Sequence, residues 1–324
     1  VNKAERERMM YNGVFVALIV VLVFGYVLER VLDALNLKHI LPVLPEELSG
    51  IYDPEEYKKS QLYKRDITRF SFFTSSLSLA VMLLVFFLGG FGWLDNIVRG
   101  LSDQYIVQVL LFFGLLGLAS DLLSTPFSVY NTFVLEERYG FNRTNALTFI
   151  LDKLKGWLLG AVIGGGLLAL ITWIYLLTGK WFWLVALAVV SLFSLFMTMF
   201  YSNLIVPLFN KQIPLEEGTL RSKIEAFAKK VGFKLDNIFV MDGSKRSSKA
   251  NAYFTGLGPR KRIVLFDTLI DDLEEEEIVA VLAHEVGHYK KKHTTSGLIL
   301  GTIQMAITLY LFSLFVGMDS FAVA

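Results

Sequence analysis

The sequence predicts an α-helical membrane protein that carries one polar α+β insert, and three observations point to this fold class. Hydrophobic side chains make up 54% of the 324 residues and charged ones only 19%, whereas soluble domains average about 45–50% apolar and about 25% charged. Apolar runs long enough to cross a bilayer recur along the chain. One segment, 209–296, instead mixes apolar and charged residues and precedes the last run.

Six apolar runs are candidate membrane helices. They lie near residues 12–28, 71–94, 105–123, 157–178, 181–208 and 297–318. The last is roughly 33 Å long at about 1.5 Å per residue, enough to cross a hydrocarbon core of about 30 Å. The expected organisation is a five-span region over 1–208, an insert over 209–296, and a sixth span within 297–324.

Lysine and arginine predict the orientation of these spans. Most of the 31 basic residues lie in three segments, 30–70, 124–156 and 209–296. Because basic loops stay on the cytoplasmic side, these segments are predicted to be cytoplasmic. After six spans the chain end then lies outside. The formal net charge of +1 gives no general case for a nucleic-acid partner.

The insert alternates helical and strand patterns. Apolar residues recur at helical spacing over 216–231, and short apolar runs bounded by glycine or charged residues predict strands. A longer helix is expected to follow the strands, acidic at its start and lysine-rich at its end, which complements the helix dipole. The predicted strands are 237–242, 251–255 and 262–267, and the predicted long helix is 271–293.

The long helix carries an HExxH motif, His284-Glu285-Val286-Gly287-His288. Residues four apart share one helix face, so the imidazoles of His284 and His288 can bind one Zn²⁺ per chain. Glu285 projects from the adjacent face and is the candidate general base for a water nucleophile. The chain has no cysteine, so thiolate ligands are excluded. The motif predicts metal-assisted peptide hydrolysis.

His293 is a further candidate, for a substrate-side or second-shell role. It follows His288 by five residues, which is about 500° of regular helix. On a regular helix it would therefore point away from the metal face, and an interface or structural role is the alternative.

The chain resembles the integral-membrane zinc metalloproteases called CAAX prenyl protease 1, the type I CAAX endopeptidases. Besides the HExxH motif, the matching stretches are 133–144, 207–211, 242–248, 251–254 and 261–269. The resemblance implies a multi-span helical barrel of seven helices that encloses a chamber. It also implies hydrolysis after a prenylated cysteine to release the last three residues, with Asn251, Ala252 and Tyr253 binding the substrate beside the zinc.

The family's third zinc ligand is a Glu in a Glu-x-x-x-Ala-Asp segment beyond a seventh span, and no Glu follows Glu285 in this sequence. The expectation is therefore that the chain is a fragment, or a cut, of a longer enzyme whose third ligand lies beyond Ala324. If the chain binds zinc tightly as it stands, the candidates become Asp267, Asp271 and His293.

Two other functions remain open from the residues. One is a membrane quality-control zinc protease that acts on misfolded membrane proteins, and the other is a non-catalytic membrane scaffold. The expected partners are a peptide or C-terminally prenylated protein and the lipid bilayer, with no nucleic acid. The expected location is the bacterial inner membrane or the endoplasmic reticulum membrane, with the zinc site on the cytoplasmic side.

Overall fold

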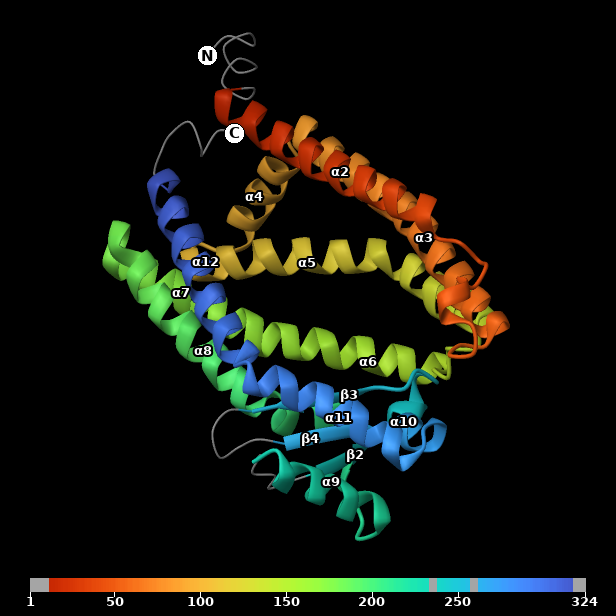
Figure 1. Ribbon diagram of the computed structural model, residues 1–324. Coiled ribbons are helices and arrows are strands. Elements are labelled where there is room, and N and C mark those ends of the chain that lie inside the picture. Colours follow the sequence, from red (N-terminus) through yellow and green to blue (C-terminus); the bar gives the residue numbers. More distant parts are fainter. Residues whose placement is uncertain (1–11, 233–237, 257–261, 317–324) are drawn as a thin grey trace. The chain divides into compact units, whose positions relative to one another are not determined.

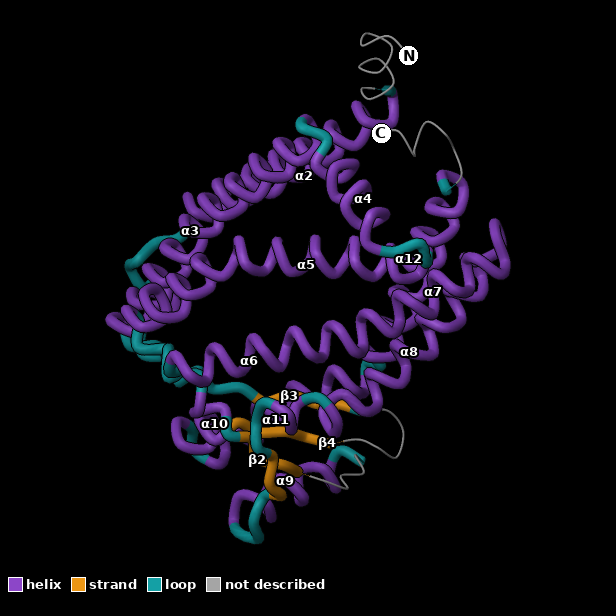
Figure 2. The backbone as a smooth tube through the Cα atoms, turned by 180° about the vertical axis from the view of Figure 1, so that it is seen from behind, coloured by secondary structure: helices purple, strands orange, loops and turns teal. Residues whose placement is uncertain are grey.

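The computed structural model describes residues 12–232, 238–256 and 262–316. These residues belong to two compact units, one formed by 1–139 with 314–324 and the other by 140–313. Figure 1 and Figure 2 show that long helices make up most of the chain and that the strands are confined to one part of the second unit.

The first unit consists mainly of helices. They are α2 (Gly13–His39), α3 (Pro54–Phe87), α4 (Gly90–Leu101), α5 (Tyr105–Tyr130) and a π-helical segment (Asn131–Glu136). The side chain of Asn12 caps α2 by accepting hydrogen bonds from Val14 N and Phe15 N. Asp53 caps α3 in the same way, with Pro54 at the first helical position.

The second predicted span, 71–94, is wrong at its end. Helix α3 stops at Phe87, and Gly89 adopts a left-handed conformation with φ +67° before α4 begins at Gly90. A residue without Cβ adopts this conformation at little cost, so the glycine pair turns the chain where hydropathy alone predicts continuation.

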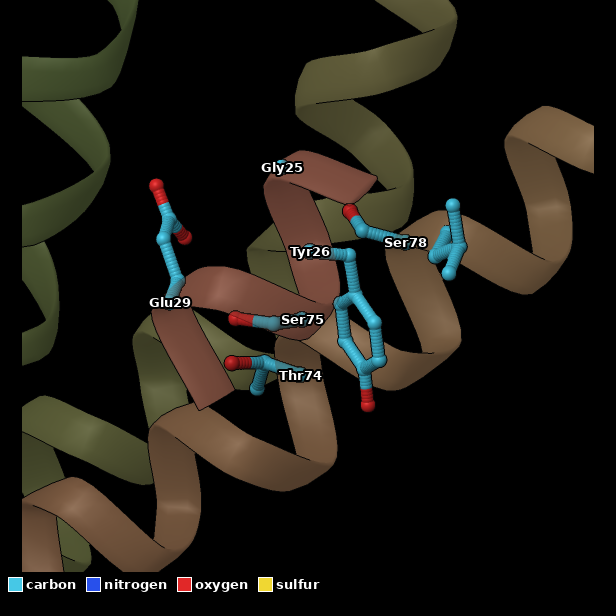
Figure 3. Close-up of a pocket in the computed structure, with 7 residues that line it drawn as sticks. Gly25, Tyr26, Glu29, Thr74, Ser75 and Ser78 are labelled. Carbon is cyan, nitrogen blue, oxygen red and sulfur yellow. The ribbon is translucent and has the colours of Figure 1, made fainter. Parts of the chain in front are cut away.

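Polar side chains join the helices of this unit. The hydroxyl of Tyr139 donates to Asp66 of α3 at 2.7 Å, and Tyr63 donates to Glu136. Between α2 and α3 lies a pocket of about 360 Å³, onto which Tyr26 and Glu29 face from α2 and Thr74, Ser75 and Ser78 from α3 (Figure 3).

The helices of the second unit that precede the strands follow one another with short connections. They are α6 (Ala146–Leu159), a π-helical segment (Gly160–Gly164), α7 (Gly165–Thr178) and α8 (Phe182–Leu204). Gly179, at φ +54°, separates α7 from α8. Helix α8 packs against α7 through a small core of Ile174, Phe182 and Ala186.

Five helical stretches are long and apolar enough to cross a membrane among the residues described: Gly13–His39, Pro54–Phe87, Tyr105–Glu136, Ala146–Leu208 and His293–Phe315. The fourth contains both the predicted span 157–178 and the predicted span 181–208. The number of six spans and the chamber therefore stay predictions.

A four-stranded sheet follows, in the order β1-β2-β4-β3. The strands are β1 (Gln212–Pro214), β2 (Ile238–Met241), β3 (Ala252–Thr255) and β4 (Arg262–Phe266). Strands β2 and β4 are parallel, and the other two pairs are antiparallel. Strands β2, β3 and β4 lie within the three predicted strands, of which only residue 237 falls outside the described residues, whereas β1 was not predicted.

Helices cover one face of the sheet with a shared apolar core. They are α9 (Thr219–Lys230), α10 (Asp267–Asp272) and α11 (Glu275–Lys290). Ile263 and Leu265 of β4 are buried together with Ile224 of α9 and Leu282 of α11. This core holds α11 against the sheet.

The single long helix predicted over 271–293 is wrong, because the chain breaks at two places. Helix α10 ends at Asp272, and α11 starts at Glu275 with a capping box in which Glu274 and Glu277 satisfy each other's backbone amides. Lys292, at φ +57°, then ends the turn after α11, and α12 (His293–Phe315) begins.

Candidate metal centre

The two faces of α11 serve different purposes. Ile278, Leu282 and Val286 are buried in the core under the sheet. His284 and His288 lie on the opposite side and are exposed, and Glu285 between the two faces is half-buried. The 3.6-residue period of the helix therefore anchors α11 by one stripe and presents both imidazoles on the other.

The two imidazoles converge. His284 Nε2 and His288 Nε2 lie 3.0 Å apart, and their ring centroids are 4.7 Å apart. Two nitrogens that bind one tetrahedral zinc at about 2.0–2.1 Å are separated by roughly 3.3–3.4 Å. A small opening of the pair would thus accommodate the ion, and imidazole nitrogens are donors that suit zinc.

His293 lies next to His288, contrary to the expectation for a regular helix. Its Nδ1 is 2.7 Å from His288 Nδ1, and the ring centroids are 4.9 Å apart. The physical reason is the break at Lys292, which carries His293 back toward α11 instead of about 140° away from His288. His288 thus directs one ring nitrogen to His284 and the other to His293.

The described residues contain no cluster of three His, Cys, Asp or Glu side chains that could hold a metal. Asp267 was one of the alternative third ligands. Its carboxylate already accepts hydrogen bonds from Ser244 N at 2.8 Å and Ser244 Oγ at 2.5 Å. Burial alone would raise the pKa of Asp267, but these bonds and one from Thr268 N outweigh it and lower the pKa. A third ligand beyond Ala324 stays a prediction.

Of the predicted substrate-binding residues, Ala252 and Tyr253 lie in β3, an edge strand of the sheet, and Asn251 directly precedes it. Phe266 N donates to Asn251 O at 3.0 Å, so the amide groups of Tyr253 and Thr255 also point toward β4 in the alternating antiparallel pattern. Ala252 then directs its amide to the outer edge, where its N–H donates to the side-chain oxygen of Asn251 at 2.9 Å.

One face of β3 packs against the metal helix. The ring of Phe254 lies 5.2 Å from that of Tyr289, the residue after His288. On the other face of the sheet, the hydroxyl of Tyr253 lies 3.3 Å from Ser202 Oγ and accepts from Gln212 Nε2 at 3.2 Å. Burial raises the pKa of Tyr253. Tyr253 therefore anchors β3 to α8, and its side chain points away from α11.

The comparisons with known proteins agree with this architecture. Residues 33–211 match the model of the CAAX prenyl protease N-terminal region, described as five membrane helices, and residues 214–323 match peptidase family M48. The chain belongs to the CAAX prenyl protease 1 family. It is therefore a helical membrane protein and a metalloendopeptidase by family.

The family relatives are similar over most of the chain. The CAAX prenyl protease 1 homolog of Arabidopsis thaliana is 38% identical over 85% of this chain and 67% of its own length. CAAX prenyl protease 1 of Saccharomyces cerevisiae is 38% identical over 90% of this chain and 65% of its own length. The chain thus spans about two thirds of the length of these relatives.

A solved structure also matches. The crystal structure of S. mikatae Ste24p has a TM-score of 0.87 to this chain at 36% identity, covering 94% of this chain and 73% of that one. The family match favours the CAAX-type prediction over the quality-control protease and the scaffold.

The stretches that carried the family resemblance meet in a hydrogen-bonded hub that was not predicted as such. Arg246 donates to both carboxylate oxygens of Asp152 at 2.7 and 2.8 Å, and to Asn210 Oδ1 at 3.0 Å. Arg143 N donates to Arg246 O at 3.0 Å. The hub joins α6 and the end of α8 to the loop after β2. Its members lie far apart in sequence: Arg143, Asn210 and Arg246 belong to the matching stretches, whereas Asp152 lies outside them and was not singled out.

Proposed function

We propose that this chain forms the catalytic region of a membrane zinc metalloendopeptidase that hydrolyses the peptide bond after a prenylated cysteine and releases the last three residues. The observation that carries the proposal is the pair of imidazole nitrogens, 3.0 Å apart on the exposed face of α11, with Glu285 beside them. The family relatives named CAAX prenyl protease 1 support the choice of substrate.

One Zn²⁺ per chain would be held by Nε2 of His284 and Nε2 of His288, with the third ligand expected beyond Ala324. When bound, zinc supplies the Lewis-acid chemistry that makes water nucleophilic near neutral pH. Glu285 takes a proton from the attacking water and delivers it to the leaving amine. Its position one residue after His284 places it on the adjacent helix face, as this role requires.

His293 positions His288. An imidazole that binds metal through Nε2 usually donates its Nδ1–H to an acceptor, which fixes the tautomer and the ring plane. His293 Nδ1 lies 2.7 Å from His288 Nδ1 and can be that acceptor. Orienting a metal ligand in this way is one of the roles that the sequence left open for His293.

The substrate backbone binds along the outer edge of β3. An extended peptide that adds to a sheet edge gains main-chain hydrogen bonds that do not depend on its side chains. Ala252 N–H points to this edge and is bonded to Asn251 Oδ1. Asn251 Oδ1 therefore occupies the place of a substrate carbonyl. When the substrate binds, its carbonyl oxygen replaces Asn251 Oδ1 as the acceptor of the Ala252 N–H. Tyr253 supports the strand from behind.

The site lies on the cytoplasmic side of the membrane, because the segment 209–296 is rich in basic residues and three lysines precede α12. The relatives named above come from a plant and a yeast, which favours the endoplasmic reticulum over a bacterial membrane.

The test is release of a C-terminal tripeptide from a farnesylated peptide by purified protein that includes the expected third-ligand segment, in lipid vesicles. Cleavage should occur at the bond after the cysteine, stop on treatment with a chelator, and return on addition of one equivalent of Zn²⁺. The matched peptide without the isoprenoid should be a poorer substrate. Cleavage that persists without metal would contradict the proposal.

A further inference from the structure

A second pocket, distinct from that of Figure 3, lies where α8 and α12 reach the sheet. Its volume is about 380 Å³. Its lining consists of Met197, Thr198 and Tyr201 of α8, Phe254 and Thr255 of β3 with Gly256 after them, and Thr294 of α12.

Two connections place this pocket beside the metal helix. Phe254 packs against Tyr289, with ring centroids 5.2 Å apart, and Tyr289 follows His288. Thr294 follows His293, whose Nδ1 lies 2.7 Å from that of His288. Phe254 and Thr255 belong to β3, so a peptide bound along the edge of this strand would run past the pocket.

The lining is suited to an apolar group. No charged side chain lines the pocket among the residues described. Thr198 Oγ1 donates to Ser194 O within α8 at 2.8 Å, so this hydroxyl is already satisfied. The volume lies at the small end of ligand pockets, which range over about 300–1,000 Å³. Met197 and Phe254 offer apolar surface to a short aliphatic chain, and a charged group would find no counter-charge among the described lining residues.

The pocket also lies where an apolar chain can arrive from the bilayer. Helices α8 and α12 are antiparallel neighbours, because Trp183 and Tyr310 pack at one end with centroids 5.3 Å apart, while Thr198 and Thr294 share the pocket at the other. Both helices belong to stretches that can cross a membrane.

We propose that this pocket binds an aliphatic group of the substrate next to the scissile bond and thereby determines specificity. The inference rests on the proposed function. The group is either an aliphatic side chain of the released tripeptide or the isoprenoid of the cysteine. Both have the same chemistry, and the experiment distinguishes them.

The first experiment fills the pocket with Thr198→Phe and compares it with Leu192→Phe, which adds the same ring on the same helix at a residue 67% exposed. One peptide series varies the isoprenoid length, and another varies the bulk of each tripeptide side chain. In the series that varies the group bound by the pocket, Thr198→Phe should lower kcat/KM about tenfold or more for the peptide with the bulkiest group. For the smallest group the loss should be within a few-fold, and Leu192→Phe should match wild type throughout. An equal loss in every peptide, or no loss, overturns the inference.

A second measurement does not depend on the variant. Peptides that carry a photoreactive aliphatic group, in the isoprenoid or in one tripeptide side chain, should cross-link to 197–201, 254–256 or 294 in the wild-type protein. Normal cleavage with cross-links only elsewhere would overturn the pocket and leave the proposed function intact. Failure to cleave or cross-link any prenylated peptide would overturn both.

Discussion

Helices α11 and α12 follow one another in sequence and use apolar residues in opposite ways. In α11, Ile278, Leu282 and Val286 are almost completely buried, at 1–3% exposure. In α12, Ile299, Leu300 and Ile303 are 51–66% exposed. The first helix is anchored by a protein core, whereas the second has the lipid-facing surface of a membrane span.

The change from one helix to the other takes place at the metal site. Lys291 and Lys292 separate them, and the positive φ of Lys292 turns the chain so that His293, the first residue of α12, meets His288 on α11. The comparison teaches that the proposed site depends on both helices: α11 carries the two proposed metal ligands, and α12 carries the residue proposed to orient one of them.

The largest expected effect comes from Glu285→Gln, which changes the reactive side of α11 without altering its buried stripe. Peptide hydrolysis should fall by at least about 10²-fold, the range of general-base loss, while zinc content stays at the wild-type level. The control is Glu225→Gln on α9, the same chemical change at an exposed surface pair. Hydrolysis rates within a few-fold of wild type would show that Glu285 is not the base.

His293→Leu tests the junction between the two helices. Removing the acceptor beside His288 Nδ1 should weaken zinc binding by about 10–100-fold, measured by competition with a chelator of known affinity. His293→Gln should restore part of the affinity, because its amide oxygen can accept the same hydrogen bond. His39→Leu is the matched control, since His39 bonds only within α2, to Leu35 O. Equal affinities in all variants would refute the positioning role.

Arg246→Lys tests the hub that joins α6 and α8 to the sheet. A lysine cannot reproduce the bidentate contact with Asp152 or the hydrogen bonds to Asn210 Oδ1 and Phe209 O. The free energy of unfolding should fall by about 1–3 kcal/mol, measured by thermal or denaturant unfolding in detergent. Arg99→Lys, at an exposed pair within α4, should change it little. A similar stability of the two variants would contradict the hub.

The orientation of the helices can be tested without background, because the chain has no cysteine. Single cysteines at exposed Ser60, Ser222 and Asp103 should react with an impermeant reagent from the cytoplasmic, cytoplasmic and opposite side respectively. If Ser222→Cys and Asp103→Cys were labelled from the same side, the predicted cytoplasmic position of the metal helix would be wrong.

The features that depend on local sequence patterns could be predicted, whereas those that depend on contacts between distant residues could not. Hydropathy predicted the membrane helices, and the spacing of His284 and His288 predicted their convergence. The break at Lys292 was missed because a run of lysines is compatible with helix, and β1 was missed because a three-residue strand has no periodicity of its own. The pairing of Arg246 with Asp152 joins residues 94 positions apart, which no local pattern reports.

The central claim is that His284 and His288 bind zinc together, and X-ray absorption at the zinc edge tests it most directly. The zinc-loaded protein should show two imidazole nitrogens at about 2.0–2.1 Å. His288→Ala should lose one of them, or lose the metal, while His39→Ala leaves the spectrum unchanged. A spectrum without imidazole, or one that His288→Ala does not alter, would contradict the account.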